Sequence, residues 1–197
     1  MSGESGVVGI VPIGEVKQVV LKILAANIQA VFNIPVDILN GRKSLKKFFN
    51  PNRNQYNAIT ILDHMERRWK QPHKRILAVV SVDLFIPILT YVFGEAQING
   101  KMAVVSTYRL NRRTGGGNVS LERFYERVAK VGIHELAHTF GLVHCKENHC
   151  VMRASYSLRD LDYYPLYFCD YCQSMLDDVY RRMKLRTLKA RSFEDLF

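Results

Sequence analysis

Hydrophobic and polar positions along the first half of the chain follow two alternating patterns. Short continuous apolar runs predict buried strands, and apolar residues spaced three and four apart predict amphipathic helices. These patterns give expected strands at 7–13, 34–39 and 75–82 and expected helices at 15–32 and 58–70. The intervening stretch 41–57 is polar and basic and predicts a loop. Strands that alternate with helices are typical of an α/β sheet.

The middle of the chain predicts a change in strand direction. Residues 97–106 have the pattern of a hairpin-like edge that turns at Asn99 and Gly100, which would give the sheet a mixed edge. Residues 112–118 predict a loop that contains Gly115, Gly116 and Gly117. This loop lacks the residues of a phosphate-binding loop, so a flexible connection is the better interpretation.

Two helices are expected after this loop. The first begins with Ser120 as its N-cap and ends at Gly141, with apolar residues at helical spacing between them. The second is expected at 173–191, with Ser174 as a possible cap and Asp177 three residues later.

The candidate chemistry lies at the end of the first of these helices. His134 and His138 are four residues apart, so on a helix they share a face and can bind one metal ion. Glu135 is placed to contact a metal-bound water, as in the HExxH motif of zinc peptidases. Gly141 can reverse the chain and bring His144 to the metal as a third ligand. A bare HExxH also arises by chance, but the glycine and third histidine in register favour a catalytic zinc with one open position.

All four cysteines of the chain follow this motif with the spacing C-x4-C-x18-C-x-x-C, at Cys145, Cys150, Cys169 and Cys172. Two close pairs separated by a loop are typical of a structural zinc site. Disulfides and a redox pair are the alternatives. The chain opens without a secretory leader, which favours a reducing compartment and therefore zinc. His149 is expected to face solvent, because four thiolates already complete the shell.

These motifs resemble the signature of the archaemetzincins, a family of zinc peptidases. Met152, eight residues beyond His144, matches the methionine that lies beneath the zinc site in metzincins. The upstream runs 82–87, 92–96 and 103–106 are also similar to that family. The resemblance covers about residues 76–172. It implies a compact metzincin-like α/β domain with a mixed twisted sheet, an active-site helix and a C-terminal helix.

The resemblance also implies roles for individual residues. Two zinc ions would bind per chain, a catalytic one at His134, His138 and His144 and a structural one at Cys145, Cys150, Cys169 and Cys172. Glu135 would be the general base and Met152 the Met-turn residue. A peptide would lie extended along an edge strand near 101–106. Some metzincins carry a tyrosine two residues after the methionine, where this chain has Ala154, and nearby Tyr156 has no assigned role.

Length and composition limit what can be expected for domain organisation, location and partners. The 197 residues suit one domain, with an N-terminal part at 1–141 and a C-terminal part at 142–197, and we expect a monomer. The longest apolar run, 76–93, contains Asp83 and Pro87, which argues against a membrane span. A cytoplasmic location is the default expectation. The net charge is +10, but the basic clusters are scattered and join no nucleic-acid motif, so a solvated surface is favoured over nucleic-acid binding.

The sequence therefore predicts a zinc-dependent peptidase in which Glu135 activates water to hydrolyse a peptide or protein substrate. The alternative is a zinc-stabilised peptide-binding protein with little turnover. The choice between endopeptidase and aminopeptidase stays open, with Glu95 as one candidate anchor for a free amine. The native catalytic metal also stays open, because three histidines can hold iron, cobalt or nickel.

Overall fold

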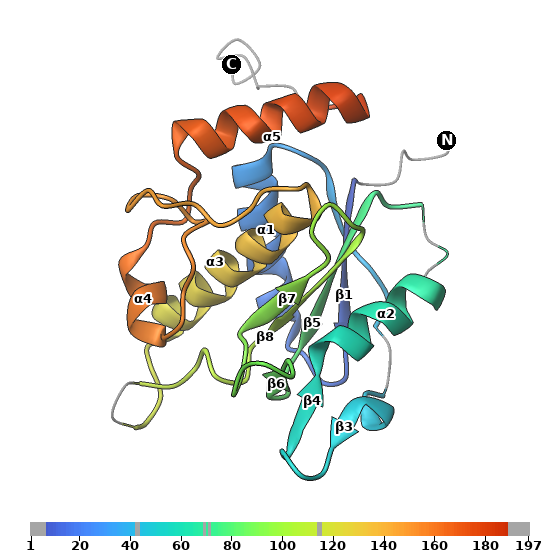
Figure 1. Ribbon diagram of the computed structural model, residues 1–197, viewed down its shortest axis with the longest axis vertical. Helices are drawn as coiled ribbons and strands as arrows, with labels where there is room; N and C mark the ends of the chain where they lie inside the picture. Colours follow the sequence, from blue (N-terminus) through green and yellow to red (C-terminus); the bar gives the residue numbers. More distant parts are fainter. Residues whose placement is uncertain (1–6, 42–43, 69, 71, 114–115, 189–197) are drawn as a thin grey trace.

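The computed structural model describes residues 7–188 apart from 42–43, 69, 71 and 114–115. Its centre is a twisted five-stranded sheet with the order β2-β1-β5-β8-β7 (Figure 1). The strands are β1 (Val8–Ile13), β2 (Val36–Ile38), β5 (Arg75–Val80), β7 (Gly94–Ala96) and β8 (Met102–Ser106). β2, β1, β5 and β8 run parallel, and β7 pairs antiparallel with β8 at the edge. The expected mixed α/β sheet is confirmed.

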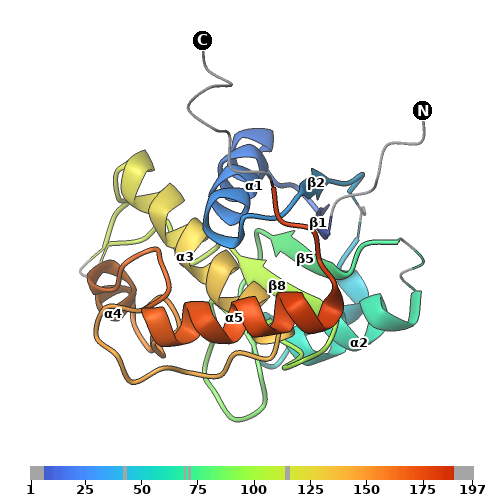
Figure 2. The same cartoon turned by 90° about the horizontal axis from the view of Figure 1, so that it is seen from above.

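Helices cover both faces of this sheet. α1 (Gln18–Phe32) and α3 (Leu121–Thr139) lie on one side and α2 (Ala58–Arg68) on the other (Figures 1 and 2). β5 shows why central strands appear continuously apolar in the sequence. Leu77 and Val79 belong to the core beneath α1 and α3, whereas Ile76, Ala78 and Val80 belong to the core beneath α2. Both faces of the strand are buried, as is typical of parallel sheets.

The C-terminal part of the chain wraps the end of the sheet that carries the metal motifs. α4 (Leu158–Tyr163) starts at a capping box made by Ser157 and Asp160. α5 (Asp170–Met183) lies across the ends of α1 and α3 (Figure 2). The Tyr180 hydroxyl donates a hydrogen bond to the Phe32 carbonyl oxygen at 2.8 Å, which ties α5 to α1. This packing holds the return segment between α3 and α5 in place.

Several element boundaries differ from the expectation. The stretch 41–57 is not wholly a loop but contains η1 (Lys46–Phe48), β3 (Phe49–Asn50) and β4 (Gln55–Asn57). β4 also pairs with β6 (Leu84–Phe85), which forms a second, three-stranded sheet. Elements of two or three residues are too short to show a period, and their pairing partners are distant in the sequence.

The C-terminal helix differs most from its expected bounds. It starts with Cys169 as N-cap instead of Ser174, and it ends at Met183 because Lys184 adopts a left-handed conformation with φ 51°. The sequence did not indicate this start, because the first turn is polar and the N-cap residue is a cysteine, which is not one of the usual capping residues. Residues 189–191 of the expected helix, residue 69 of the expected second helix and Gly115 of the glycine loop lie outside the described residues.

The edge strand is also different from the one that the sequence indicated. Residues 102–106 form β8, which pairs with β5 on one side and β7 on the other, so a peptide cannot extend the sheet there. The edge of the sheet next to β8 is β7, and the opposite edge is β2. Among the described residues, no helix is both long and apolar enough to cross a bilayer.

Candidate metal centres and active site

α3 carries the first half of the candidate active site. The Ser120 hydroxyl accepts a hydrogen bond from the Arg123 backbone N–H and so caps the helix as expected. At the other end Gly141 has φ 92°, and the backbone N–H groups of Gly141 and Leu142 donate to the carbonyl oxygens of His138 and Ala137. This glycine-dependent stop reverses the chain toward His144.

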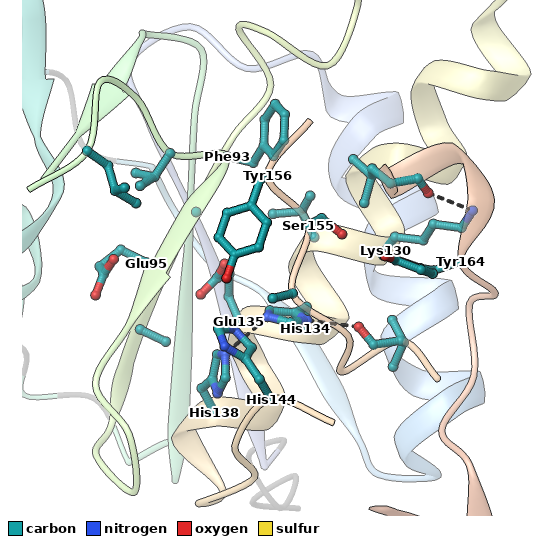
Figure 3. Close-up of a pocket in the computed structure, with 18 of the residues that line it drawn as sticks. Phe93, Glu95, Lys130, His134, Glu135, His138, His144, Ser155, Tyr156 and Tyr164 are labelled. Carbon is teal, nitrogen blue, oxygen red and sulfur yellow. Dashed lines mark hydrogen bonds between the residues drawn. The ribbon is translucent and has the colours of Figure 1, made fainter. Parts of the chain in front are cut away.

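The three histidines converge on one point. Their candidate ligand nitrogens lie within 4.8 Å of one another, and Figure 3 shows the three rings turned toward a common centre. His134 Nδ1 lies 2.8 Å from the Val151 carbonyl oxygen, and His138 Nδ1 lies 2.7 Å from the Leu142 carbonyl oxygen. A carbonyl oxygen only accepts, so each Nδ1 carries the proton and each Nε2 presents a lone pair.

The two Nε2 atoms of His134 and His138 are 3.1 Å apart. Two lone pairs at that distance repel each other unless a cation lies between them. The donor set therefore fits a metal ion, and the carbonyl groups of Val151 and Leu142 supply the outer hydrogen bonds that orient metal-binding imidazoles.

The electrostatics of the site keep these ligands neutral. Burial, followed by the neighbouring His138, lowers the pKa of His134 to about 3. Burial also lowers the pKa of His138 and of His144. Neutral imidazoles at ordinary pH are the form that binds a metal.

Glu135 lies one residue beyond the first histidine and points into the cavity (Figure 3). Burial raises its pKa well above the usual value, and the charge of Glu95 adds to this rise. Gly94 of the edge strand makes room for it, because a Cβ at that position would lie 2.5 Å from Glu135 Cγ. The absence of a side chain at Gly94 therefore lets the carboxylate lie directly against β7.

The four cysteines form a second group. Their sulfur atoms lie within 4.8 Å of one another, and Cys145 Sγ is 3.8 Å from Cys169 Sγ, too far for a disulfide. Backbone N–H groups of Met152 and Cys169 donate to Cys150 Sγ at 3.4 Å, as suits a sulfur that carries negative charge. This donor set fits a tetrahedral zinc. His149 is exposed and stays outside the group, as expected.

One short segment links the two groups. The Cys145 backbone N–H donates to the Met152 carbonyl oxygen at 2.9 Å, which joins the segment after His144 to the segment after Cys150. Val151 lies between Cys150 and Met152, and its carbonyl accepts from His134. Met152 itself is fully buried. The sequence could not reveal the roles of Val151 and Leu142, because both act through backbone carbonyls.

The histidines open onto a cavity of about 480 Å³ between α3, the β7 edge and the segments 86–92 and 154–165. Most of its lining is apolar, and the ionisable groups among the described lining residues are Glu95, Glu135, Lys130, the histidines and tyrosines. Tyr156 stands at its mouth, 75% exposed, and Figure 3 shows its ring in front of Glu135. The Tyr91 hydroxyl donates to the Tyr156 carbonyl oxygen at 3.2 Å, so the two walls of the mouth are joined.

Comparisons with known proteins agree with this geometry. The family model of peptidase family M54 matches residues 14–178. An archaemetzincin of Archaeoglobus fulgidus is 36% identical over 156 residues, which cover 79% of this chain and 90% of that protein. The crystal structure of an archaemetzincin from Methanopyrus kandleri superposes with a TM-score of 0.78 at 32% identity, covering 89% of this chain and 96% of that one. A metalloproteinase from Bacteroides fragilis shares the fold at 10% identity, with a TM-score of 0.52, and covers 88% of this chain and 52% of that one.

The fold, the histidine group and these relatives together define a zinc metallopeptidase. More narrowly, the chain belongs to peptidase family M54, and its resemblance to the archaemetzincins is confirmed.

Proposed function

We propose that the chain hydrolyses peptide bonds at the histidine group, with Glu135 as general base. His134, His138 and His144 would hold a zinc ion, which would supply a Lewis acid for the scissile carbonyl and for the attacking water. Glu135 accepts the proton of the attacking water and transfers it to the leaving amine. The observation that carries this proposal is the meeting of three neutral imidazoles and an unpaired carboxylate in one cavity.

The burial of Glu135 supports its role in proton transfer. A carboxylate with a raised pKa holds a proton more firmly than one in water, which suits a group that must take up a proton and then release it. Within the described residues, its side chain has no hydrogen bond or ion pair to hold it away from the substrate.

The edge strand supports an extended peptide as the substrate. Ser106 N–H donates to the Phe93 carbonyl oxygen and Gln97 N–H to the Met102 carbonyl oxygen, so residues 93, 95 and 97 direct their backbone groups toward β8. Gly94 and Ala96 consequently direct theirs outward, along the wall of the cavity. A substrate strand could accept and donate main-chain hydrogen bonds there, which is binding by strand addition.

We infer a second zinc ion at Cys145, Cys150, Cys169 and Cys172, with a structural role. Through Cys150 it would fix the Val151 carbonyl that orients His134, and through Cys145 it would fix the adjacent ligand His144. Met152 would act as the Met-turn residue beneath the histidines. The segment 142–197 would then be a zinc-stabilised part of a single domain.

Replacement of Glu135 by glutamine tests the proposed base. We expect kcat on a broad peptide library to fall by about 10²–10⁴-fold, because the amide cannot accept the proton. Zinc content, measured by elemental mass spectrometry, is expected to stay at the parent value.

Glu122→Gln, an exposed change in the first turn of the same helix, is the matched control and should cleave like the parent. Equal cleavage by Glu135→Gln and the parent would remove Glu135 as the base. Peptide binding without chelator-sensitive cleavage by the parent would instead favour a peptide-binding protein.

A further inference from the structure

Glu95 is a half-buried carboxylate that the proposed hydrolysis does not use. It lies in the middle of β7 and belongs to the lining of the cavity. No hydrogen bond or ion pair to its side chain occurs within the part of the chain that the structure describes. Burial raises its pKa, since the surrounding protein replaces part of its water. An unpaired carboxylate in such a place is costly unless a cation reaches it.

Two arginines contact other residues of the cavity lining, and both are already engaged. The Arg53 guanidinium donates to the carbonyl oxygens of Leu89 and Thr90, and Arg109 is paired with Asp83 through two hydrogen bonds. The acidic character of this edge is increased by Glu66 of α2, which accepts a hydrogen bond from Gln97. Glu95 and Glu66 thus place two carboxyl groups beside β7.

Glu95 also faces a different side of β7 from Glu135. Side chains alternate along a strand, and a Cβ at Gly94 would point at Glu135, so Glu95 points to the opposite face. Figure 3 shows its carboxylate turned away from the three imidazoles. Glu95 is therefore poorly placed to act on the scissile bond but well placed to contact a substrate side chain.

Strand addition defines which substrate group it would contact. If an antiparallel peptide bonds to the outward backbone groups of Gly94 and Ala96, the residue opposite Glu95 occupies a non-hydrogen-bonded pair, where side chains approach most closely. Its side chain lies on the same face as Glu95. On this basis, and resting on the proposed function, we propose that Glu95 selects substrates that carry a cationic group, a lysine or arginine side chain, at the position opposite it.

A lysine scan tests this selection. Acetylated, internally quenched peptides carry a single lysine at each position in turn, with uncharged norleucine as the matched side chain. Zinc-loaded parent protein is expected to show one position at which lysine raises kcat/KM about tenfold over norleucine. Glu95→Gln should lose this preference, and Glu95→Lys should prefer glutamate at the same position. The matched control Glu122→Gln, at an exposed position in the first turn of α3, should keep the parent's preference.

Two further arms make the result decisive. The norleucine peptides with a free N-terminus show whether an α-amine can take the place of the lysine side chain. Binding of every peptide to zinc-loaded Glu135→Gln, measured by fluorescence anisotropy, scores the charge preference independently of turnover. Failure of cleavage with a Glu95-dependent binding preference would count against the proposed hydrolysis alone. A lysine preference that survives in Glu95→Gln, or no charge preference in either assay, would overturn the role of Glu95.

Discussion

The histidine group and the cysteine group are built from adjacent residues, yet they meet solvent in opposite ways. All three histidines line the cavity, and none of the four cysteines does so among the described residues. Two of the cysteines are fully buried, and His144 is exposed. Three ligands with an open side suit a metal that acts on a substrate, whereas four sulfurs that complete a tetrahedral shell away from the cavity suit a metal that holds the chain.

The difference shows how one short segment can contribute to both the histidine group and the cysteine group. The closed group constrains the segment 150–152, and that segment presents the Val151 carbonyl to His134. The dependence is not symmetric, because within the described residues no cysteine receives a hydrogen bond from a histidine side chain. Loss of the closed site should therefore disturb the open one, while loss of the open site should leave the closed one intact.

A pair of ligand substitutions tests most directly whether the histidine group depends on the cysteine group. Cys169→Ser is expected to remove zinc from the cysteine group and to lower both unfolding stability, by several kcal/mol, and zinc affinity of the histidine group. Serine is a favourable N-cap, so the start of α5 is preserved and the effect reports the lost thiolate. Two zinc ions in the parent and fewer than one in the variant, measured by elemental mass spectrometry, would support the coupling.

His138→Gln is the mirror variant. It should lose one zinc ion and at least 10³-fold in kcat/KM, while the cysteine group keeps its zinc. Full occupancy of the histidine group in Cys169→Ser would show that the two groups are independent.

The sequence predicted the grouping of the three histidines and of the four cysteines better than the scaffold around them. His134, His138 and Gly141 are spaced by the helix that carries them, so their convergence follows from local geometry alone. The open edge could not be assigned in the same way, because β7 becomes the edge only through pairing with β8 in a sheet of distant strands. The contribution of Gly94, which leaves space for Glu135, likewise depends on a contact between residues far apart in the chain.

Acid titration would sharpen the comparison, since imidazoles titrate near neutrality and thiols do not. In protein whose histidine site alone has been emptied, the pKa of His134 is about 3, below its value of 6.5 in the unfolded chain. Between pH 6.5 and pH 3 the unfolded chain binds a proton at His134 that the folded chain excludes. The free energy of unfolding therefore decreases as the pH falls. The expected loss in the free energy of unfolding is about 1.4 kcal/mol per pH unit, and denaturant unfolding at pH 6 and pH 5 measures it.

Substitution of His134 separates its protonation from the protonation of other side chains in this pH range. His134→Gln should lower the pH slope by nearly this amount. Equal slopes in the variant and the parent would mean that His134 is not held neutral by burial.

The smallest effect is expected at the turn of Gly141, which lies between the helix α3 and the cysteine group. Gly141→Ala forces a side chain into φ 92°, which should cost about 1–3 kcal/mol of stability. The nearest atom to the new Cβ is Asn99 Oδ1 at 3.6 Å, so the cost is conformational and not a clash. Because relief of the strain would shift His144, we expect zinc affinity of the histidine group to fall about tenfold with the cysteine group still filled.

Gly14→Ala provides the matched control for this turn. Gly14 also has a positive φ, 79°, with open space around its Cβ position, but it lies at the end of β1 and contacts neither metal group. Both variants should lose similar stability in denaturant unfolding, and only Gly141→Ala should lose zinc affinity. Equal zinc affinities would show that the position of His144 is set from the Cys145 side alone, and the turn at Gly141 would then serve only to end α3.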